Sequence, residues 1–199
     1  DVVLSHLREI GIDNAVRQPL GVDTELFHPR LRDRDIRRRL GLAPQTRLLV
    51  FAGRFAAEKN MWVLEQALRI LGPPYVLLAV GGGPHPPRGA NVITLPFEAQ
   101  ADSLAGWLSS ADALVHAGDQ ETFGLVVLEA MACGLPVVGP DAGGIRELID
   151  DAVGVRVRPR DPKAMAEGIA ALFAADPLTR GARARERVVA RFDWNAVMP

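Results

Sequence analysis

The 199-residue sequence contains a single cysteine, Cys133, and four histidines. One cysteine excludes an internal disulfide framework, and no group of Cys and His residues has the spacing of a structural zinc site. Because such cysteine usage fits a reducing compartment, we expect a cytoplasmic protein.

Long apolar runs and an excess of charge of one sign are also missing. The longest apolar stretches, such as 48–52 and 75–80, are far shorter than the ~20 residues that span a bilayer. The 23 Lys and Arg residues against 24 Asp and Glu leave a net charge of −1, so no whole-protein field attracts nucleic acid or an anionic membrane. We expect no nucleic-acid partner and no membrane span, and a peripheral membrane contact stays open.

The chain also lacks an initiator Met, a basic leader and an apolar leader, so we expect an excised part of a longer protein. A chain of 199 residues with 48% apolar residues should bury roughly 70% of its unfolded surface, enough for one substantial core. The sequence therefore predicts one domain.

Apolar runs bounded by glycines alternate with stretches of helical period. The expected strands are 48–52, 75–80, 92–95, 113–116, 137–138 and 153–157. The expected helices are 60–71, 101–110, 124–133, 144–149, 162–174 and 177–191. This alternation favours an α/β fold with a Rossmann-like parallel sheet flanked by helices. The arginine-rich segment 30–39 is best interpreted as a solvated helix, with contact to an anionic lipid or acceptor as the alternative.

In open α/β sheets, ligands bind where the carboxyl ends of strands meet the amino ends of helices. The loop after the first strand carries Arg54 and Lys59, two cations beside a helix N-terminus that could hold a diphosphate. The alternative is that both are surface residues paired with Glu58 or Glu65.

The segment 116–134 carries Glu121 in a loop and Glu129 in the following helix. Thr122 could cap that helix, and the N–H groups of Gly124 and Leu125 would then point at an arriving anion. Glu129 among apolar neighbours is costly without a partner, and either a ribose diol or a nearby arginine would serve.

Four other features are weaker. Gly81, Gly82 and Gly83 precede Pro84, which spoils a dinucleotide fingerprint, and no phosphate-loop motif exists. The turn 141–144 is either a plain connection or a ligand wall. Cys133 is expected to be a core residue, and His116 is the histidine expected to touch substrate.

Together these segments resemble the C-terminal, nucleotide-sugar-binding half of retaining GT-B glycosyltransferases of the family 4-like group 1. The matching segments are PLGVDTELFHP at 19–29, GRFAAEKN at 53–60, VGGGP at 80–84 and ETFGLVVLEAMACGLPVVGPDAGGIRELI at 121–149. The resemblance covers nearly the whole chain. It implies that 1–199 is the donor-binding half of a GT-B fold, with 1–29 as an interdomain linker and a strand that leads into the domain.

The resemblance implies catalytic roles for Arg54, Lys59 and Glu121: the cations bind the donor diphosphate, and Glu121 contacts the transferred sugar. It implies donor-binding roles for Gly53, Phe97, Phe123, Gly124, Leu125 and Glu129, with Glu129 on the ribose hydroxyls and Phe97 near the base. No metal and no cofactor are implied, since the two cations and a helix N-terminus handle the diphosphate charge.

The implied function is retaining transfer of a hexose from a nucleotide sugar, such as GDP-mannose or a UDP-hexose, to an acceptor glycan or lipid-linked sugar. The N-terminal half would carry much of the acceptor site, so the fragment should bind donor and fail to turn over. Leu20 replaces the family's usual Asn, and Asn60 replaces its usual Gly. The alternatives are a nucleotide-sugar epimerase or phosphorylase of this fold, or a non-catalytic nucleotide-binding module.

Overall fold

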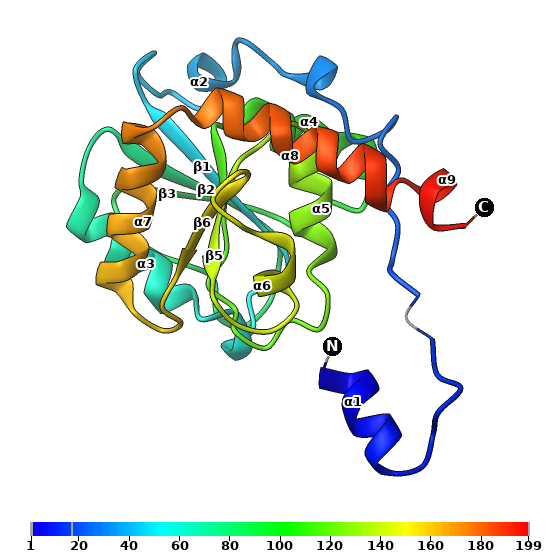
Figure 1. The fold of residues 1–199 in the computed structure, drawn as a ribbon. Coiled ribbons are helices and arrows are strands. Elements are labelled where there is room, and N and C mark those ends of the chain that lie inside the picture. Colours follow the sequence, from blue (N-terminus) through cyan, green and yellow to red (C-terminus); the bar gives the residue numbers. More distant parts are fainter. Residues whose placement is uncertain (1, 17, 199) are drawn as a thin grey trace.

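The computed structural model describes residues 2–16 and 18–198 as a helix-flanked parallel sheet (Figure 1). Its six strands run in the order β3-β2-β1-β4-β5-β6, and every neighbouring pair is parallel. The strands are β1 (Arg47–Ala52), β2 (Tyr75–Val80), β3 (Val92–Leu95), β4 (Ala113–Val115), β5 (Val137–Pro140) and β6 (Gly154–Val157). The predicted fold class and all six predicted strands are confirmed, with ends shifted by at most two residues.

Alternating side chains of the strands build one core on each face of the sheet. In β1, Leu48 and Val50 enter one core, whereas Leu49 and Phe51 enter the other. All four are fully buried, as expected for a central strand of a parallel sheet that is covered on both faces.

Helices cover both faces of the sheet (Figure 1). The face that Leu49 and Phe51 enter is covered by α3 (Met61–Leu71) and α7 (Pro162–Ala174). The opposite face is covered by α4 (Ala101–Ser110), α5 (Leu125–Ala132), α6 (Ile145–Leu148) and α8 (Pro177–Phe192). All six predicted helices are present.

Two helices begin with Asp as the cap and Pro as the first helical residue. Asp161 accepts a hydrogen bond from the N–H of Ala164, and Asp176 accepts one from the N–H of Thr179. The aspartate thereby accepts from an N–H group of the first turn that has no partner within the helix, and the proline fixes the backbone angle φ near its helical value.

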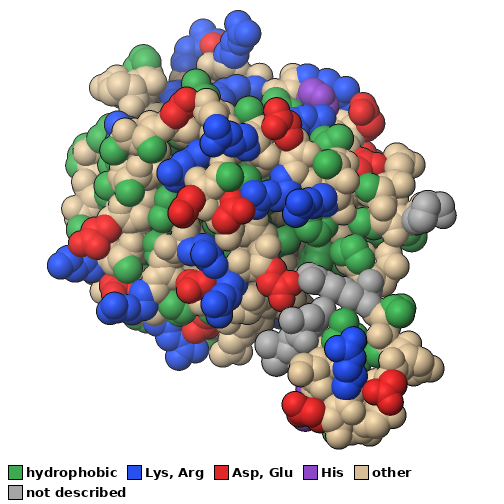
Figure 2. Space-filling model, viewed as in Figure 1, with side chains coloured by type: hydrophobic (Ala, Val, Ile, Leu, Met, Phe, Trp, Pro, Cys, Tyr) green, Lys and Arg blue, Asp and Glu red, His purple; other side chains and the backbone are tan. Residues whose placement is uncertain are grey.

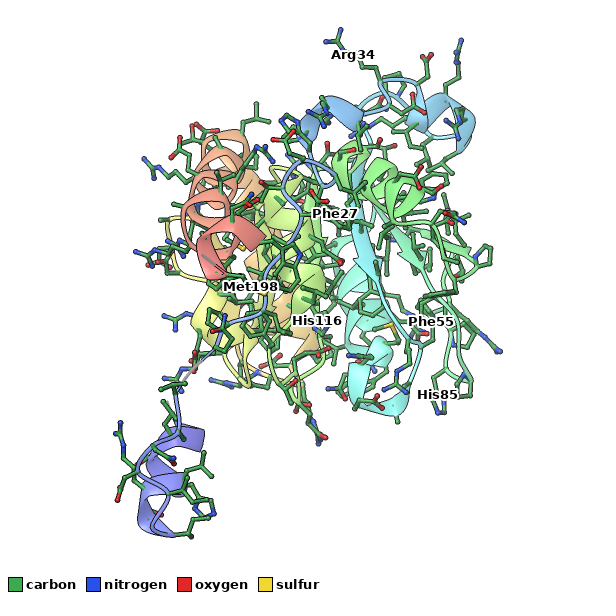
Figure 3. All side chains as sticks on the ribbon, turned by 90° about the vertical axis from the view of Figure 1, so that its right-hand side faces the viewer. Phe27, Arg34, Phe55, His85, His116 and Met198 are labelled. Atoms are coloured by element: carbon green, nitrogen blue, oxygen red, sulfur yellow. The ribbon has the colours of Figure 1, made fainter. Side chains whose placement is uncertain are left out.

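The segment 30–39 differs from the predicted single solvated helix. It forms a short 3-10 turn, η1 (Pro29–Leu31), and a one-turn helix, α2 (Ile36–Arg39). Arg37 is largely buried and pairs with Asp112, which also accepts from Arg32 at 3.1 Å. Figure 3 places Arg34 at the far end of the molecule from His85, which lies in the loop after β2.

The N-terminal segment forms α1 (Val2–Glu9), which stands apart from the sheet (Figure 1). A strand leading into the domain was expected within 1–29. In the described part of this segment, the β-type pairing is limited to an isolated bridge between Val22 and Asp193. The Val22 N–H donates to the carbonyl of Phe192 at 2.8 Å, and Gln18 donates to the carbonyl of Val197 at 2.7 Å. The segment is thereby tied to α8 and to α9 (Trp194–Val197).

Among the described residues, no helix has both the length and the apolar character needed to cross a bilayer. Figure 2 shows Lys and Arg side chains interspersed with Asp and Glu over the face that carries α6 and α8. This mixture agrees with the near-neutral net charge.

Candidate nucleotide-sugar site

The strand order places a topological switch point between β1 and β4. From β1 the chain passes to β2 on one side, whereas β4 lies on the other side of β1. The loops that follow β1 and β4 lead to helices on opposite faces of the sheet, and in open α/β sheets this arrangement gives a ligand crevice at the carboxyl ends of the two strands. The loop after β1 carries Lys59, and the loop after β4 carries Glu121.

Glu121 is the centre of the polar contacts in this crevice. Its Oε1 atom accepts a hydrogen bond from Lys59 Nζ and lies 3.1 Å from His116 Nε2. The hydrogen bond from His116 and the contact with Lys59 outweigh the cost of burial and lower the pKa of Glu121 to about 2. The carboxylate is therefore ionised at neutral pH.

His116 lies beneath Glu121, with its side chain 1% exposed. Its backbone N–H donates to the Val138 carbonyl at 2.9 Å, which fixes the residue to β5 just beyond the end of β4. The expectation that His116 touches substrate is therefore wrong: the ring is buried in the body of the molecule (Figure 3).

A side-chain amide joins the two loops of the crevice. Asn60 has a left-handed backbone (φ 51°), and its Nδ2 donates to the Ala117 carbonyl and to Asp119 Oδ1, both at 3.1 Å. Asp119 also accepts from Arg160 Nε at 2.7 Å. A glycine could adopt the same backbone but could not make these bonds, so Asn60 adds a tie that the sequence alone did not reveal.

The first turn of α5, which follows the loop that carries Glu121, has free backbone donors. Gly124 is the residue before the helix, with φ +87°, and no side chain caps the turn. Across the described chain, neither a carbonyl nor a side chain accepts from the N–H groups of Gly124 or Leu125. The expectation that Thr122 caps the helix is wrong, and the free N–H groups suit an anion.

Glu129 lies one turn into α5 and is mostly buried. Burial raises its pKa from 4.5 to about 7, and within residues 2–16 and 18–198 no donor or cation pairs with its carboxyl group. The alternative of a salt bridge to an arginine is thus not found in the described part. An acidic side chain in such a position is available to hydroxyl groups of a ligand.

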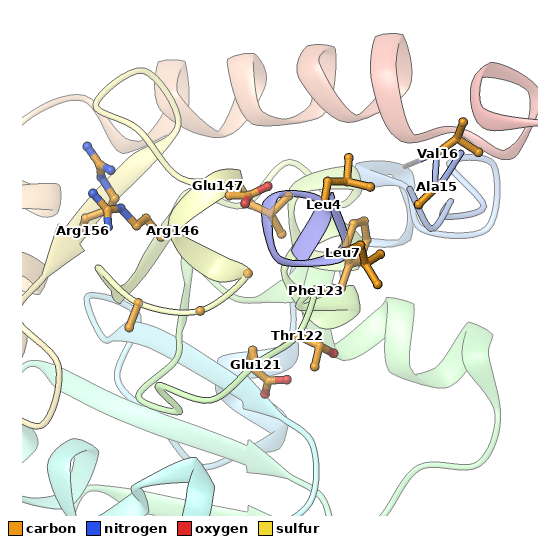
Figure 4. A pocket seen from close by; sticks show the side chains of 14 residues that line it. Leu4, Leu7, Ala15, Val16, Glu121, Thr122, Phe123, Arg146, Glu147 and Arg156 are labelled. Atoms are coloured by element: carbon orange, nitrogen blue, oxygen red, sulfur yellow. The ribbon is translucent and has the colours of Figure 1, made fainter. Parts of the chain in front are cut away.

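A cavity of about 780 Å³ opens beside Glu121. Figure 4 shows Glu121, Thr122 and Phe123 on its wall with Leu4 and Leu7 of α1 nearby. Gly143 and Gly144 also line it, so the turn 141–144 is a wall of this cavity. No three metal-ligating side chains come together in the described part of the chain.

A family model for glycosyl transferases group 1 matches residues 46–175, which is more than half of the chain. This chain belongs to the group 1 glycosyltransferases.

Two relatives and one solved structure illustrate the likeness. The D-inositol 3-phosphate glycosyltransferase of Xylanimonas cellulosilytica is 36% identical over 89% of this chain and 47% of its own length. The GDP-mannose-dependent α-(1-6)-phosphatidylinositol dimannoside mannosyltransferase of Mycobacterium tuberculosis is 34% identical over 93% of this chain and 50% of its own. The HepE protein of Anabaena, solved with UDP-glucose, superposes with a TM-score of 0.83 at 23% identity, covering 98% of this chain and 58% of that one.

The group 1 glycosyltransferase chain spans about half the length of these curated relatives. It corresponds to the C-terminal half of a GT-B fold, as the resemblance implied.

Two further candidate residues of this glycosyltransferase chain, Arg54 and Phe97, are more exposed than Lys59 and Glu121. The Arg54 side chain is 77% exposed and pairs with Glu58 at 2.9 Å, which was the alternative for this residue. Phe97 is 71% exposed beyond the end of β3. Gly53 (φ +148°) follows the last residue of β1, and its N–H donates to the Val80 carbonyl. Their roles toward a donor stay predictions.

Proposed function

We propose that this chain binds a nucleotide-diphosphate sugar at the crevice between the β1 and β4 loops and serves as the donor half of a retaining hexosyltransferase. The observation that supports this proposal best is the juxtaposition of Lys59, Glu121 and the uncapped first turn of α5 at the switch point. A diphosphate with an attached sugar needs a cation, free N–H groups and an acceptor for hydroxyl groups in one site.

The proposed roles follow from chemistry. In the transfer, the bond between the anomeric carbon and the diphosphate oxygen breaks, and its electrons leave with the nucleotide. Lys59, Arg54 and the N–H groups of Gly124 and Leu125 would stabilise this developing negative charge. Glu121 would accept hydrogen bonds from the sugar, Glu129 from the ribose hydroxyls, and Gly53, Phe97 and Phe123 would complete the donor contacts.

The relatives and structural neighbours are named with different donors, so the nucleotide that this chain binds has to be measured. One relative is named for GDP-mannose, and one structural neighbour was solved with UDP-glucose. The acceptor, either a glycan or a lipid-linked sugar, would be bound mainly by the other half of a GT-B enzyme.

Calorimetric titration with UDP, GDP and ADP tests the site. We expect one nucleotide to bind, and Lys59→Ala to weaken that binding by about 1.5–3 kcal/mol, because a charged hydrogen-bond partner of the diphosphate is lost. The chain contains two lysines, Lys59 and Lys163, and the second is 80% exposed on α7. Lys163→Ala is therefore the matched control and should bind as the wild type does.

The same titration distinguishes the competing ideas. Equal loss of affinity in both lysine variants would contradict a specific role for Lys59. A wild-type chain that binds none of the three nucleotides, while thermal unfolding shows it folded, would contradict the proposal that this half alone holds the donor.

A further inference from the structure

The two oxygens of Glu121 are used unequally. Both His116 Nε2 and Lys59 Nζ reach Oε1, whereas no donor in residues 2–16 and 18–198 reaches Oε2. Glu121 also lines the cavity beside α1. One oxygen is thus anchored to the protein, and the other retains its lone pairs for a ligand.

The imidazole of His116 is fixed by contacts on both nitrogens. The N–H of Gly118 donates to Nδ1 at 3.1 Å, so in the neutral ring the proton is on Nε2, which faces Glu121. The ring centroid lies 5.6 Å from that of Phe51, at an interplanar angle of 38°. Burial, tautomer and packing together leave the Nε2–H group one direction in which to donate.

Gly118 makes this arrangement sterically feasible. A Cβ atom at this position would lie 2.8 Å from His116 Cε1 and 3.1 Å from the Glu58 carbonyl oxygen. The absence of a side chain lets the β4 loop close over the ring and rest on the loop that carries Lys59.

We infer that His116 is a positioning residue: it holds Glu121 through Oε1 so that Oε2 faces the hydroxyl groups of the transferred sugar. This inference rests on the proposed function, because it needs a sugar in the crevice. Lys59 cannot be the sole anchor of Glu121, since the donor diphosphate competes for the same ammonium group. His116 is buried out of reach of the donor, so its bond to Glu121 persists when Lys59 turns to the phosphate.

This division of roles predicts that replacing His116 weakens the contribution of the sugar to binding and leaves the affinity for the free nucleotide diphosphate unchanged. We would titrate the wild type, His116→Phe and His116→Gln with UDP-glucose against UDP and with GDP-mannose against GDP. Phe keeps the packing on Phe51 but donates nothing, whereas the Gln amide can donate to Glu121. The sugar contribution is the ratio of the Kd of the free nucleotide diphosphate to the Kd of the nucleotide sugar. In His116→Phe this ratio should fall about tenfold, as for loss of a charged hydrogen bond. The affinity for the free nucleotide diphosphate should be unchanged, and His116→Gln should recover most of the loss.

A wild type that binds neither sugar nucleotide would contradict the proposed function itself, whereas one that binds a sugar nucleotide no more tightly than its diphosphate would overturn the inference. A wild type that shows the sugar advantage, with His116→Phe retaining all of it, would overturn the role of His116 alone.

A second measurement does not depend on a folded variant. A long-range ¹H–¹⁵N spectrum of the wild-type chain should show His116 protonated on Nε2 and unprotonated on Nδ1. An imidazole with its proton on Nδ1 would overturn the inference.

Discussion

Replacing Glu129 with glutamine is expected to stabilise the chain at pH 8 and to leave its stability unchanged at pH 4. The wild-type carboxyl has a pKa of about 7 in the folded chain against 4.5 in the unfolded chain, because burial disfavours its charged form. Between these values the folded state keeps a proton that the unfolded state releases. The free energy of unfolding therefore falls as the pH rises from about 4.5 to 7.

The size of this effect follows from the pKa difference. Each pKa unit corresponds to about 1.4 kcal/mol, so ionisation of Glu129, whose pKa rises from 4.5 to about 7, removes about 3 kcal/mol of stability by pH 8. Glutamine has nearly the same shape and stays neutral at every pH. Below pH 4.5 the wild-type carboxyl is neutral too, and the two proteins should unfold together.

Urea unfolding of the wild type and Glu129→Gln at pH 4, 6 and 8 measures this difference. Glu167→Gln is the control, since Glu167 is a 69% exposed carboxylate on α7 and its neutralisation should change stability little. A Glu129→Gln protein that is less stable than the wild type at pH 8 would show that the carboxylate has a stabilising partner.

The same substitution should act on binding in the opposite direction. A ribose diol would donate to the Glu129 carboxylate, so Glu129→Gln should weaken nucleotide binding by about 1–3 kcal/mol while it stabilises the free chain. A residue that destabilises its own fold and strengthens ligand binding is typical of a functional site.

Most of the fold could be predicted from the sequence because its signals are local. The bounds of β2, β3, α4 and α7 agree with the predicted ranges, since each of these segments has an apolar pattern of strand or helix period within its own residues. The segment 30–39 could not be predicted in this way. Its conformation depends on the pairing of Arg37 with Asp112, 75 residues away, and such long-range ion pairs leave no local pattern.

The proximity of two candidate residues could be predicted in part for the same reason. Lys59 and Glu121 each follow a buried strand, so the sequence places both at one edge of a parallel sheet. Their direct pairing and the anchoring role of His116 depend on how closely two loops approach. Gly118 beside His116 carried a signal of that approach, because a glycine after a buried strand permits close backbone contact. Nothing comparable in the sequence indicated that helix α1 lies beside the cavity.

Replacing Gly144 with alanine is expected to displace the loop that carries Glu121 and to weaken donor binding strongly. A Cβ atom at Gly144 would lie 2.4 Å from the Thr122 carbonyl oxygen and 2.8 Å from Phe123 Cα. These are backbone atoms, which cannot move aside as a flexible side chain can. The Gly144 N–H also donates to the Glu121 carbonyl at 2.7 Å, so the two loops have to separate or the bond has to distort.

Overpacking of this kind costs typically about 1–3 kcal/mol of stability, and displacement of Glu121 should lower affinity for a nucleotide sugar by tenfold or more. The backbone of Gly144 has φ −66°, ψ −25°, which alanine adopts freely, so the effect is steric. Gly106 in α4 is the matched control, because nothing lies within 4 Å of its Cβ position. There alanine should stabilise the helix by up to about 1 kcal/mol.

Thermal unfolding and calorimetric titration of both alanine variants separate the two effects. Gly106→Ala should bind as the wild type and unfold at a higher temperature, whereas Gly144→Ala should unfold lower and bind weakly. If Gly144→Ala binds the sugar nucleotide with wild-type affinity, the 141–144 turn does not hold Glu121 in place. The donor sugar would then have to be bound by the β1 and β4 loops without this wall, and Glu121 would owe its position to His116 and Lys59 alone.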